Sequence, residues 1–293
     1  MIQHITRNQL DEQKYNNCIS NASNSRIYAY SWYLDIVCDD WDVLIKDDYN
    51  FVMPLPKRIF FGINYIYQAP WVQQLGIFSN TVIDESIVLE FIKSIPRKFK
   101  LIDIFFNSDS VINSKRVSSR KNFVLQLVKS YEILRKKYSK GRKSSIKRAQ
   151  NSDLLIVEGY NHDEIIELFK QNKGIKLQKK VSDYDLLSEL FEHALTLNFA
   201  KSYGIVNSSN KLIGGAFFLI DSRRITYLFS AINNEGRKKQ AMSFLIDHVI
   251  KCNAESIYIF DFEGSMITEL ASFFKSFGAV KEEYFWYKRY FFR

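Results

Sequence analysis

LIGGAFFLIDSRRITYLFSA (Leu212–Ala231) decides how the second half of this 293-residue chain is interpreted. Two apolar runs, rich in aromatic and β-branched residues, flank the pair Asp221-Ser222, which is typical of a tight turn between strands. A further strand pattern, KSYGIVNS, comes just before them. The stretch therefore predicts the centre of a β-sheet.

Outward from this centre, apolar spacing predicts a regular series of elements. A strand at 154–160 is followed by helices at 161–174 and 182–198, the three central strands, and a helix at 240–252. A strand at 256–262, a helix at 267–278 and a last strand near 283–292 complete the series. The predicted order is β-α-α-β-β-β-α-β-α-β.

The first half contains a fainter copy of this series. WDVLIK, FVMPLPKR and YIYQAP predict three strands, DESIVLEFIKSIP a helix and LIDIFF a strand. Matching strands lie about 155–162 residues apart, which favours a tandem duplication over two unrelated α/β stretches. We expect an α/β (α+β) protein with mixed sheets flanked by helices, and domains at 1–121 and 122–293. The final strand is free to pack back toward the first domain.

Composition indicates a globular protein with a basic surface. Apolar residues make up 46% and charged residues 25%, and the formal net charge is +9. Such a charge suits a nucleic acid, a CoA-like nucleotide, a phosphorylated precursor or an anionic membrane, or serves solubility alone. No run approaches about 18 apolar residues and no signal region is evident, so we expect a cytoplasmic protein, with peripheral membrane contact left open. Cys18, Cys38 and Cys252 are interpreted as free thiols.

The most basic segment lies between the two halves. Eight of the fourteen residues from Arg135 to Arg148 are Lys or Arg. They suit the phosphates of tRNA or the diphosphate of a nucleotide-linked precursor, although a solvated linker helix explains them too. Helical spacing predicts Ile146 and Ala149 inward, with the cations at the rim. These rim residues are Arg142, Lys143, Lys147 and Arg148.

Several motifs carry a resemblance to a known family. FVLQLVKSYEILRKKYSKGRKSSIKRAQ contains a pattern made by Ser139, Arg142 or Lys143, Ile146 and Ala149, and FDFEGS ends the fifth strand of the second copy. Together with the element order, they resemble tandem Gcn5-related N-acetyltransferase (GNAT) folds of the Fem-type, FemAB-like or BioF2-like acyltransferases. The resemblance implies transfer of an acyl or aminoacyl group to an amine. Fem enzymes take it from aminoacyl-tRNA and place it on a peptidoglycan precursor; other relatives use acyl-CoA.

The loop expected to hold a donor's pyrophosphate is incomplete in both copies. NEGRKKQAM offers Arg237 and Lys238, but Gln240 stands where the GNAT pattern has a glycine. Glycine lets a phosphate approach the backbone closely, and a side chain obstructs it. The first copy offers Gln73 and Gln74. We expect no tightly bound cofactor and no metal, with acyl-CoA or aminoacyl-tRNA as the donor substrate.

Asp261 and Glu263 close an otherwise apolar strand, YIFDFEG. Alternation along a strand puts both on one face, at the carboxyl edge where α/β sheets bind ligands. Glu263 is the preferred general base, whereas Asp261 would equally orient an Arg or cap backbone amides. A purely structural salt bridge is an equal alternative for both acids. Ser265 is predicted to cap the next helix rather than to act as a nucleophile.

Aromatic and hydroxyl groups complete the predicted site. Tyr227, Ser230 and the Trp32-Tyr33 pair would line an acceptor pocket, although such aromatics more often belong to a core. We expect the site between the two halves, with the first serving the acceptor. Two rival functions remain: acyl-CoA-dependent N-acylation of a small molecule or sugar amine, and a non-catalytic module that binds RNA or a membrane surface. The acyl group, the acceptor and the oligomeric state are not determined by these patterns.

Overall fold

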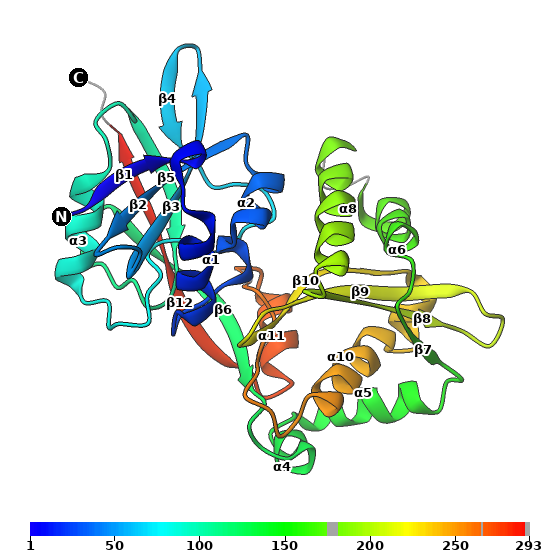
Figure 1. The fold of residues 1–293 in the computed structure, drawn as a ribbon. Coiled ribbons are helices and arrows are strands. Elements are labelled where there is room, and N and C mark those ends of the chain that lie inside the picture. The colour runs from blue at the N-terminus through cyan, green and yellow to red at the C-terminus, as the bar shows by residue number, and fades with distance from the viewer. Residues whose placement is uncertain (175–180, 265, 291–293) are drawn as a thin grey trace. The chain divides into compact units, whose positions relative to one another are not determined.

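A computed structural model describes residues 1–174, 181–264 and 266–290 of the chain (Figure 1). The chain divides into two compact units. Unit 1 comprises Met1–Lys121 together with the chain from Glu282 onward, and unit 2 comprises Asn122–Lys281. Ser265, for which the sequence predicts a capping role, lies outside the described residues.

Unit 1 has a six-stranded sheet whose order is β1-β2-β3-β4-β5-β12. Its strands are β1 (Gln3–Thr6), β2 (Asp40–Lys46), β3 (Phe51–Phe60), β4 (Ile63–Ile66), β5 (Leu101–Phe106) and the part of β12 (Val280–Tyr290) that lies in this unit. Its helices are α1 (Glu12–Asn21), α2 (Ser31–Val37) and α3 (Glu85–Ser94). Only β4 and β5 run parallel; the other neighbouring strands with a described register are antiparallel.

Unit 2 repeats that order as β7-β8-β9-β10-β11-β6. Its strands are β7 (Leu155–Glu158), β8 (Ala200–Val206), β9 (Leu212–Ile220), β10 (Arg224–Ile232), β11 (Ile259–Asp261) and the end of β6 (Val117–Gln126). Its helices are α4 (Tyr131–Lys136), α5 (Lys140–Gln150), α6 (His162–Phe169), α8 (Val181–Thr196), α9 (Asn234–Lys238), α10 (Ala241–Cys252) and α11 (Thr268–Lys275). Again one pair, β10 and β11, is parallel.

The two sheets therefore have the same strand order and the same pattern of directions. The sixth strand of each set is exchanged in chain order: β6 comes before all the other strands of unit 2 and pairs with β11, whereas β12 comes after them and pairs with β5. The predicted fold class, mixed sheets flanked by helices, is confirmed. Tandem duplication remains the interpretation that this topology favours.

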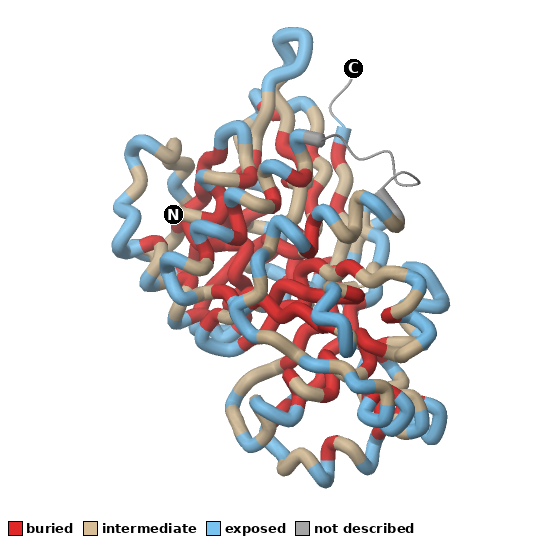
Figure 2. Tube along the Cα trace, turned by 90° about the vertical axis from the view of Figure 1, so that its right-hand side faces the viewer, coloured by how far each residue is buried: buried red, intermediate tan, exposed pale blue. Residues whose placement is uncertain are grey.

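Each unit has its own apolar core around its sheet, visible as buried strands in Figure 2. In unit 2, α6 and α8 cover one face of the sheet, and α5 and α10 cover the other (Figure 1). The core on this second face includes Ile146 of α5, Leu245 of α10 and Phe260 of β11, all without exposed surface. Ile146 and Ala149 are buried as their helical spacing predicts.

One strand is shorter than its sequence predicts. The apolar run 256–262 forms a strand only over Ile259–Asp261, and Ile257 is 79% exposed. The run is apolar enough for a longer strand, but a strand extends only as far as a neighbouring strand pairs with it. β10 and β6 each offer β11 partners for three residues.

Within the described residues, no helix combines the length and apolar character needed to cross a bilayer.

Candidate active site and basic hollow

Strands β10 and β11 separate directly after Asp261. Their parallel pairing ends with Thr226 opposite Asp261, while β10 continues to Ile232. The residue after Asp261, Phe262, donates its backbone N–H to the carbonyl of Phe123 of β6 at 3.0 Å. Beyond Thr226, no strand pairs with β10 on this side within the part of the chain that is described.

A bulge in β10 lies at the same place. The register against β9 shifts between Tyr227 and Phe229, so Leu228 is an extra residue in β10. Bulges redirect side chains and bend a strand away from its neighbour. The backbone of β10 past Thr226 is thus positioned to pair with an extended ligand, as an added strand would.

Asp261 forms an internal salt bridge at this parting. Its side chain is 2% exposed, and its Oδ2 lies 2.6 Å from Nη1 of Arg224. Its Oδ1 accepts the backbone N–H of Glu263 at 2.9 Å. Asp261 thus orients an arginine and caps a backbone amide, the two structural roles that the sequence leaves open for it. We interpret it as a positioning residue for the turn that follows.

Glu263 has a left-handed backbone, with φ of 56°. Non-glycine residues seldom adopt this conformation, and it costs roughly 1 kcal/mol or more. Because β11 ends at Asp261, strand alternation does not extend to Glu263, and the shared-face argument for the two acids does not apply. Half-buried Glu263 nevertheless lies in the turn where the strands part, held there by Asp261.

Tyr227 and Ser230 lie on β10 beyond the pairing with β11. Tyr227 is 9% exposed and belongs to the apolar core, where its ring lies 5.4 Å from that of Phe218. Burial raises the pKa of Tyr227, and a hydrogen bond with Ser230 partly offsets this. Tyr227 therefore has the core position that such aromatics usually take, and Ser230 is the more accessible of the two.

The segment between β10 and α10 forms a helical turn, α9, rather than an open glycine loop. Arg237 and Lys238 are exposed on it, and Arg237 donates to the carbonyl of Ile232 at 3.2 Å. Gln240 has φ of 60° and donates its side-chain amide to the carbonyl of Arg237. Its side chain forms no cap on α10. The first amides of α10 are thus left to other partners.

Arg142 is buried rather than at the rim, which corrects the prediction. It is 9% exposed, and the spacing from Arg142 to Ile146 and Ala149 puts all three on one face of α5. Its Nη1 donates to the hydroxyl of Ser243 in the first turn of α10, and its Nε donates to Ser276 at 2.9 Å. Helical spacing alone would place Arg142 on the buried face of α5. The prediction put it at the rim because charged residues are rarely buried.

The Arg142 guanidinium is enclosed by aromatic rings. It lies 4.2 Å from the ring centroid of Phe273 and 4.5 Å from that of Phe277. Burial lowers the pKa of Arg142 to about 10. No carboxylate forms an ion pair with it among the described residues. A desolvated cation beside a helix N-terminus is an electrostatic environment that favours an anion.

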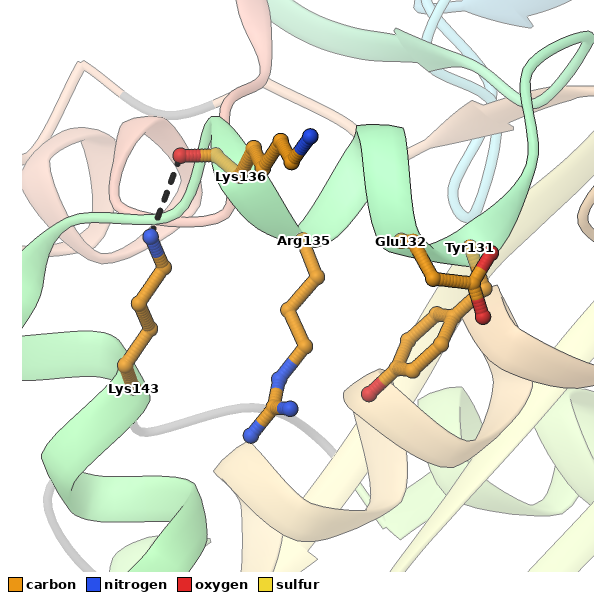
Figure 3. A pocket seen from close by; sticks show the side chains of 5 residues that line it. All are labelled: Tyr131, Glu132, Arg135, Lys136 and Lys143. Carbon is orange, nitrogen blue, oxygen red and sulfur yellow. Dashed lines mark hydrogen bonds between the residues drawn. The ribbon is translucent and has the colours of Figure 1, made fainter.

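A hollow of about 420 Å³ lies among side chains of α4 and the neighbouring Lys143 of α5 (Figure 3). It is lined by Tyr131, Glu132, Arg135, Lys136 and Lys143. Arg135 extends into it from α4, and its Nε is buried without a hydrogen-bond partner among the described residues (Figure 3). Lys143 donates to the carbonyl of Lys136 at 3.1 Å. Three cations and one carboxylate make the hollow suited to a phosphate.

Tyr131 links the hollow to α10, a feature that the sequence did not single out. Its hydroxyl lies 2.9 Å from both carboxylate oxygens of Asp247, one turn beyond Ser243. Asp247 is 4% exposed, and burial raises its pKa from the ordinary value of 3.8. An acid on an otherwise apolar helix face, IDHVI, is the signal that would have found it.

The other predicted residues are dispersed. Arg148 is exposed at the end of α5. Gln73, Gln74 and Trp32 lie in unit 1, where Gln74 is fully buried and donates to Gln73 at 2.6 Å, and Trp32 is half-buried against Tyr33. Among the described residues, no group of His, Cys, Asp and Glu gathers as metal ligands. The site that the structure assembles thus comes from unit 2.

No family model matches the sequence, and no curated protein matches it. Solved structures do. The crystal structure of FemX matches with a TM-score of 0.69 and 11% identity, over 97% of this chain and 96% of that one. The chain has the fold of FemX.

Two lysylphosphatidylglycerol synthetase structures share this Fem-like fold. The C-terminal domain (DUF2156) of a putative synthetase from Agrobacterium fabrum matches with a TM-score of 0.59 and 10% identity, over 94% of this chain and 91% of that one. L-PGS from Bacillus licheniformis matches with a TM-score of 0.55 and 12% identity, over the same shares. The predicted resemblance to Fem-type proteins is confirmed at the level of the fold.

Proposed function

We propose that the protein is a Fem-like transferase that moves an acyl or aminoacyl group from tRNA onto an amine, with a cell-wall precursor as the acceptor. The observation that carries this proposal is the parting of β10 and β11 after Asp261, with Glu263 held in the turn. An ester carbonyl that pairs with β10 beyond Thr226 would lie beside that carboxylate. The Fem-like fold supports the same assignment.

The basic hollow supports a donor that carries phosphates. Residues 129–148 contain nine Lys or Arg and one Glu, so they account for eight of the nine net positive charges of the chain. Arg135, Lys136 and Lys143 line the hollow, and Arg142, the neighbour of Lys143 in α5, is buried with its guanidinium against Ser243 in the first turn of α10. α10 follows the carboxyl end of β10 after the short helix α9. A donor with its carbonyl at β10 would thus have its phosphates near these cations.

tRNA fits these residues better than CoA does. A CoA pyrophosphate needs an open glycine cradle ahead of α10, whereas here Gln240 occupies that place and closes its side chain onto Arg237. The alternative, an acyl-CoA-dependent N-acyltransferase for a small molecule or sugar amine, would have to use the hollow alone.

The proposed step is direct transfer. The amine attacks the ester carbonyl, and a nitrogen–carbon bond forms as the bond to the ribose oxygen breaks. Glu263, or a water that it holds, takes the proton from the amine and returns it to the leaving ribose oxygen. Backbone N–H groups at the edge of β10 would polarise the carbonyl.

The test compares donors with the purified chain. Labelled aminoacyl-tRNA and labelled acyl-CoA are each offered with a nucleotide-linked cell-wall precursor and with simple amines, and transfer is measured. We expect transfer from charged tRNA. Transfer from acyl-CoA alone would establish the alternative instead. Binding of every polyanion alike, without transfer and abolished by moderate salt, would identify a non-catalytic RNA- or membrane-binding module.

Two variants separate chemistry from binding. Glu263→Gln should lower kcat roughly 10²–10⁴-fold and leave donor binding nearly unchanged. Arg135→Gln should weaken tRNA binding and reduce its salt dependence by about one phosphate contact, with kcat little changed. Lys93→Gln, an exposed charge on α3 of unit 1, is the matched control and should change neither. Full activity of Glu263→Gln would remove Glu263 from the mechanism.

A further inference from the structure

The hairpin formed by β3 and β4 exposes an apolar tip. Ile59 is 71% exposed, Phe60 63%, Phe61 90% and Ile63 40%. Figure 1 shows the hairpin extending from unit 1, and Figure 2 shows its end exposed. Single exposed apolar side chains are normal on a protein surface, but four large ones gathered at one tip mark a contact site.

The turn at the tip contains Phe61, a residue type that this kind of turn disfavours. Phe60 pairs with Ile63, so Phe61 and Gly62 form a two-residue turn with φ of 46° and 77°. Both positions of such a turn require positive φ, which Asn-Gly or Gly-Gly supply without strain. An aromatic residue at the first position is strained. Phe61 at this position thus points to a role beyond closing the hairpin.

Positive charge flanks the tip. β4 and β5 run parallel with Tyr65 opposite Leu101, and the N–H of Lys100 donates to the carbonyl of Asn64 at 2.9 Å. The preceding segment, Arg97–Lys100, therefore lies at the same edge of the sheet as the hairpin tip. Arg97, Lys98 and Lys100 are all exposed there.

One of these three cations, Lys98, has an acidic partner. Lys98 lies 3.7 Å from Asp42, but that carboxylate also pairs with His4 and Lys57. No ion pair to Arg97 or Lys100 is present in the described ranges 1–174, 181–264 and 266–290. An apolar tip beside exposed cations, two of them outside any ion pair among the described residues, is complementary to an anionic lipid surface.

We propose that the β3–β4 hairpin inserts its tip into the surface of an anionic bilayer, with Arg97, Lys98 and Lys100 contacting the lipid headgroups. The convex tip can enter a soft interface without a matching pocket, and the stretch from Ile59 to Ile66 contains no charged residue to oppose entry. This proposal rests on unit 1 alone and is independent of the transferase assignment.

The test uses the full chain in flotation assays with vesicles of phosphatidylcholine, alone or mixed with phosphatidylglycerol. We expect binding to the mixed vesicles and little to phosphatidylcholine alone. Lys98→Gln combined with Lys100→Gln should weaken binding to mixed vesicles, roughly fivefold for each charge. Failure of the wild type to float with mixed vesicles would overturn the proposal.

Phe61→Asn separates insertion from folding. Because Asn-Gly suits the turn, the thermal midpoint should rise or stay unchanged, while vesicle binding weakens about tenfold. Val82→Asn is the matched control, since Val82 is 82% exposed outside the hairpin, and it should leave vesicle binding unchanged. Equal vesicle binding by Phe61→Asn and the wild type would overturn the proposal.

Sedimentation without vesicles tests whether the hairpin tip instead contacts a second copy of this chain. A dimer that Phe61→Asn dissolves would instead assign the tip to an interface between copies of this chain. A monomer that floats only with anionic vesicles supports insertion.

Discussion

Asp261→Asn tests whether the end of β11 depends on its buried ion pair. Arg224 and Asp261 have side chains that are 6% and 2% exposed, with Nη1 and Oδ2 2.6 Å apart. The substitution keeps an oxygen that can accept the N–H of Glu263 but removes the negative charge. It also removes the carboxylate charge that lies 2.6 Å from the buried guanidinium of Arg224.

The expected magnitude follows from that burial. Removing one partner of a buried pair typically costs about 3–5 kcal/mol, because the remaining charge stays desolvated. Since the asparagine oxygen keeps its hydrogen bonds, we expect the lower end, about 3 kcal/mol. An exposed pair provides the control: Lys201 and Glu158 lie 2.7 Å apart with side chains 49% and 56% exposed. Glu158→Gln should cost about 0.5 kcal/mol or less.

The assay is urea unfolding followed by circular dichroism, with the free energy of unfolding obtained by linear extrapolation. Combining Asp261→Asn with Arg224→Met should recover much of the loss, since no buried charge then remains. A free energy of unfolding for Asp261→Asn within about 1 kcal/mol of the wild type would refute the reasoning, because the pair would then contribute no more than a surface pair does.

Three further substitutions probe the packing of α10, α9 and α5. Burial raises the pKa of Asp247, although the hydrogen bond from Tyr131 acts in the opposite direction. Above its folded-state pKa, the ionised carboxylate therefore lowers the stability of the folded state. Well below the ordinary value of 3.8, the carboxyl is neutral in both the folded and the unfolded state, and this effect disappears. Asp247→Asn should therefore raise the thermal midpoint at pH 7 and have little effect at pH 3; a lower midpoint at pH 7 would contradict this. Gly236→Ala would bring a Cβ within 2.4 Å of the carbonyl oxygen of Ile213 and should cost about 1–3 kcal/mol in urea unfolding. At Gly141 of α5, an added Cβ would have no atom within 4 Å, so Gly141→Ala should instead stabilise the protein by about 0.5–1 kcal/mol. Equal effects of Gly236→Ala and Gly141→Ala would count against the packing argument.

Local patterns of the sequence determined the elements of this protein. Alternating and continuous apolar runs predict β2, β3, β9 and β10, because residues two positions apart in a strand lie on the same face of the sheet. Ser139 begins α5 by accepting the N–H of Arg142, and Asn161 begins α6 in the same way. The acidic end of β11 and the basic segment around α5 were also evident, because charged residues in apolar or clustered settings are conspicuous in a sequence.

Only the tertiary structure decided which elements meet. β6 pairs with β11, and β12 pairs with β5, through contacts between segments more than a hundred residues apart that no local spacing encodes. Likewise Arg142 becomes a buried cation because Phe273, Phe277 and Ser243 come from distant helices to enclose it. β11 ends at Asp261 because the pairing of β10 and β6 with it ends there, not because its apolar pattern stops. Periodicity fixes which face a residue is on, whereas burial, pairing and electrostatic environment depend on what packs against that face.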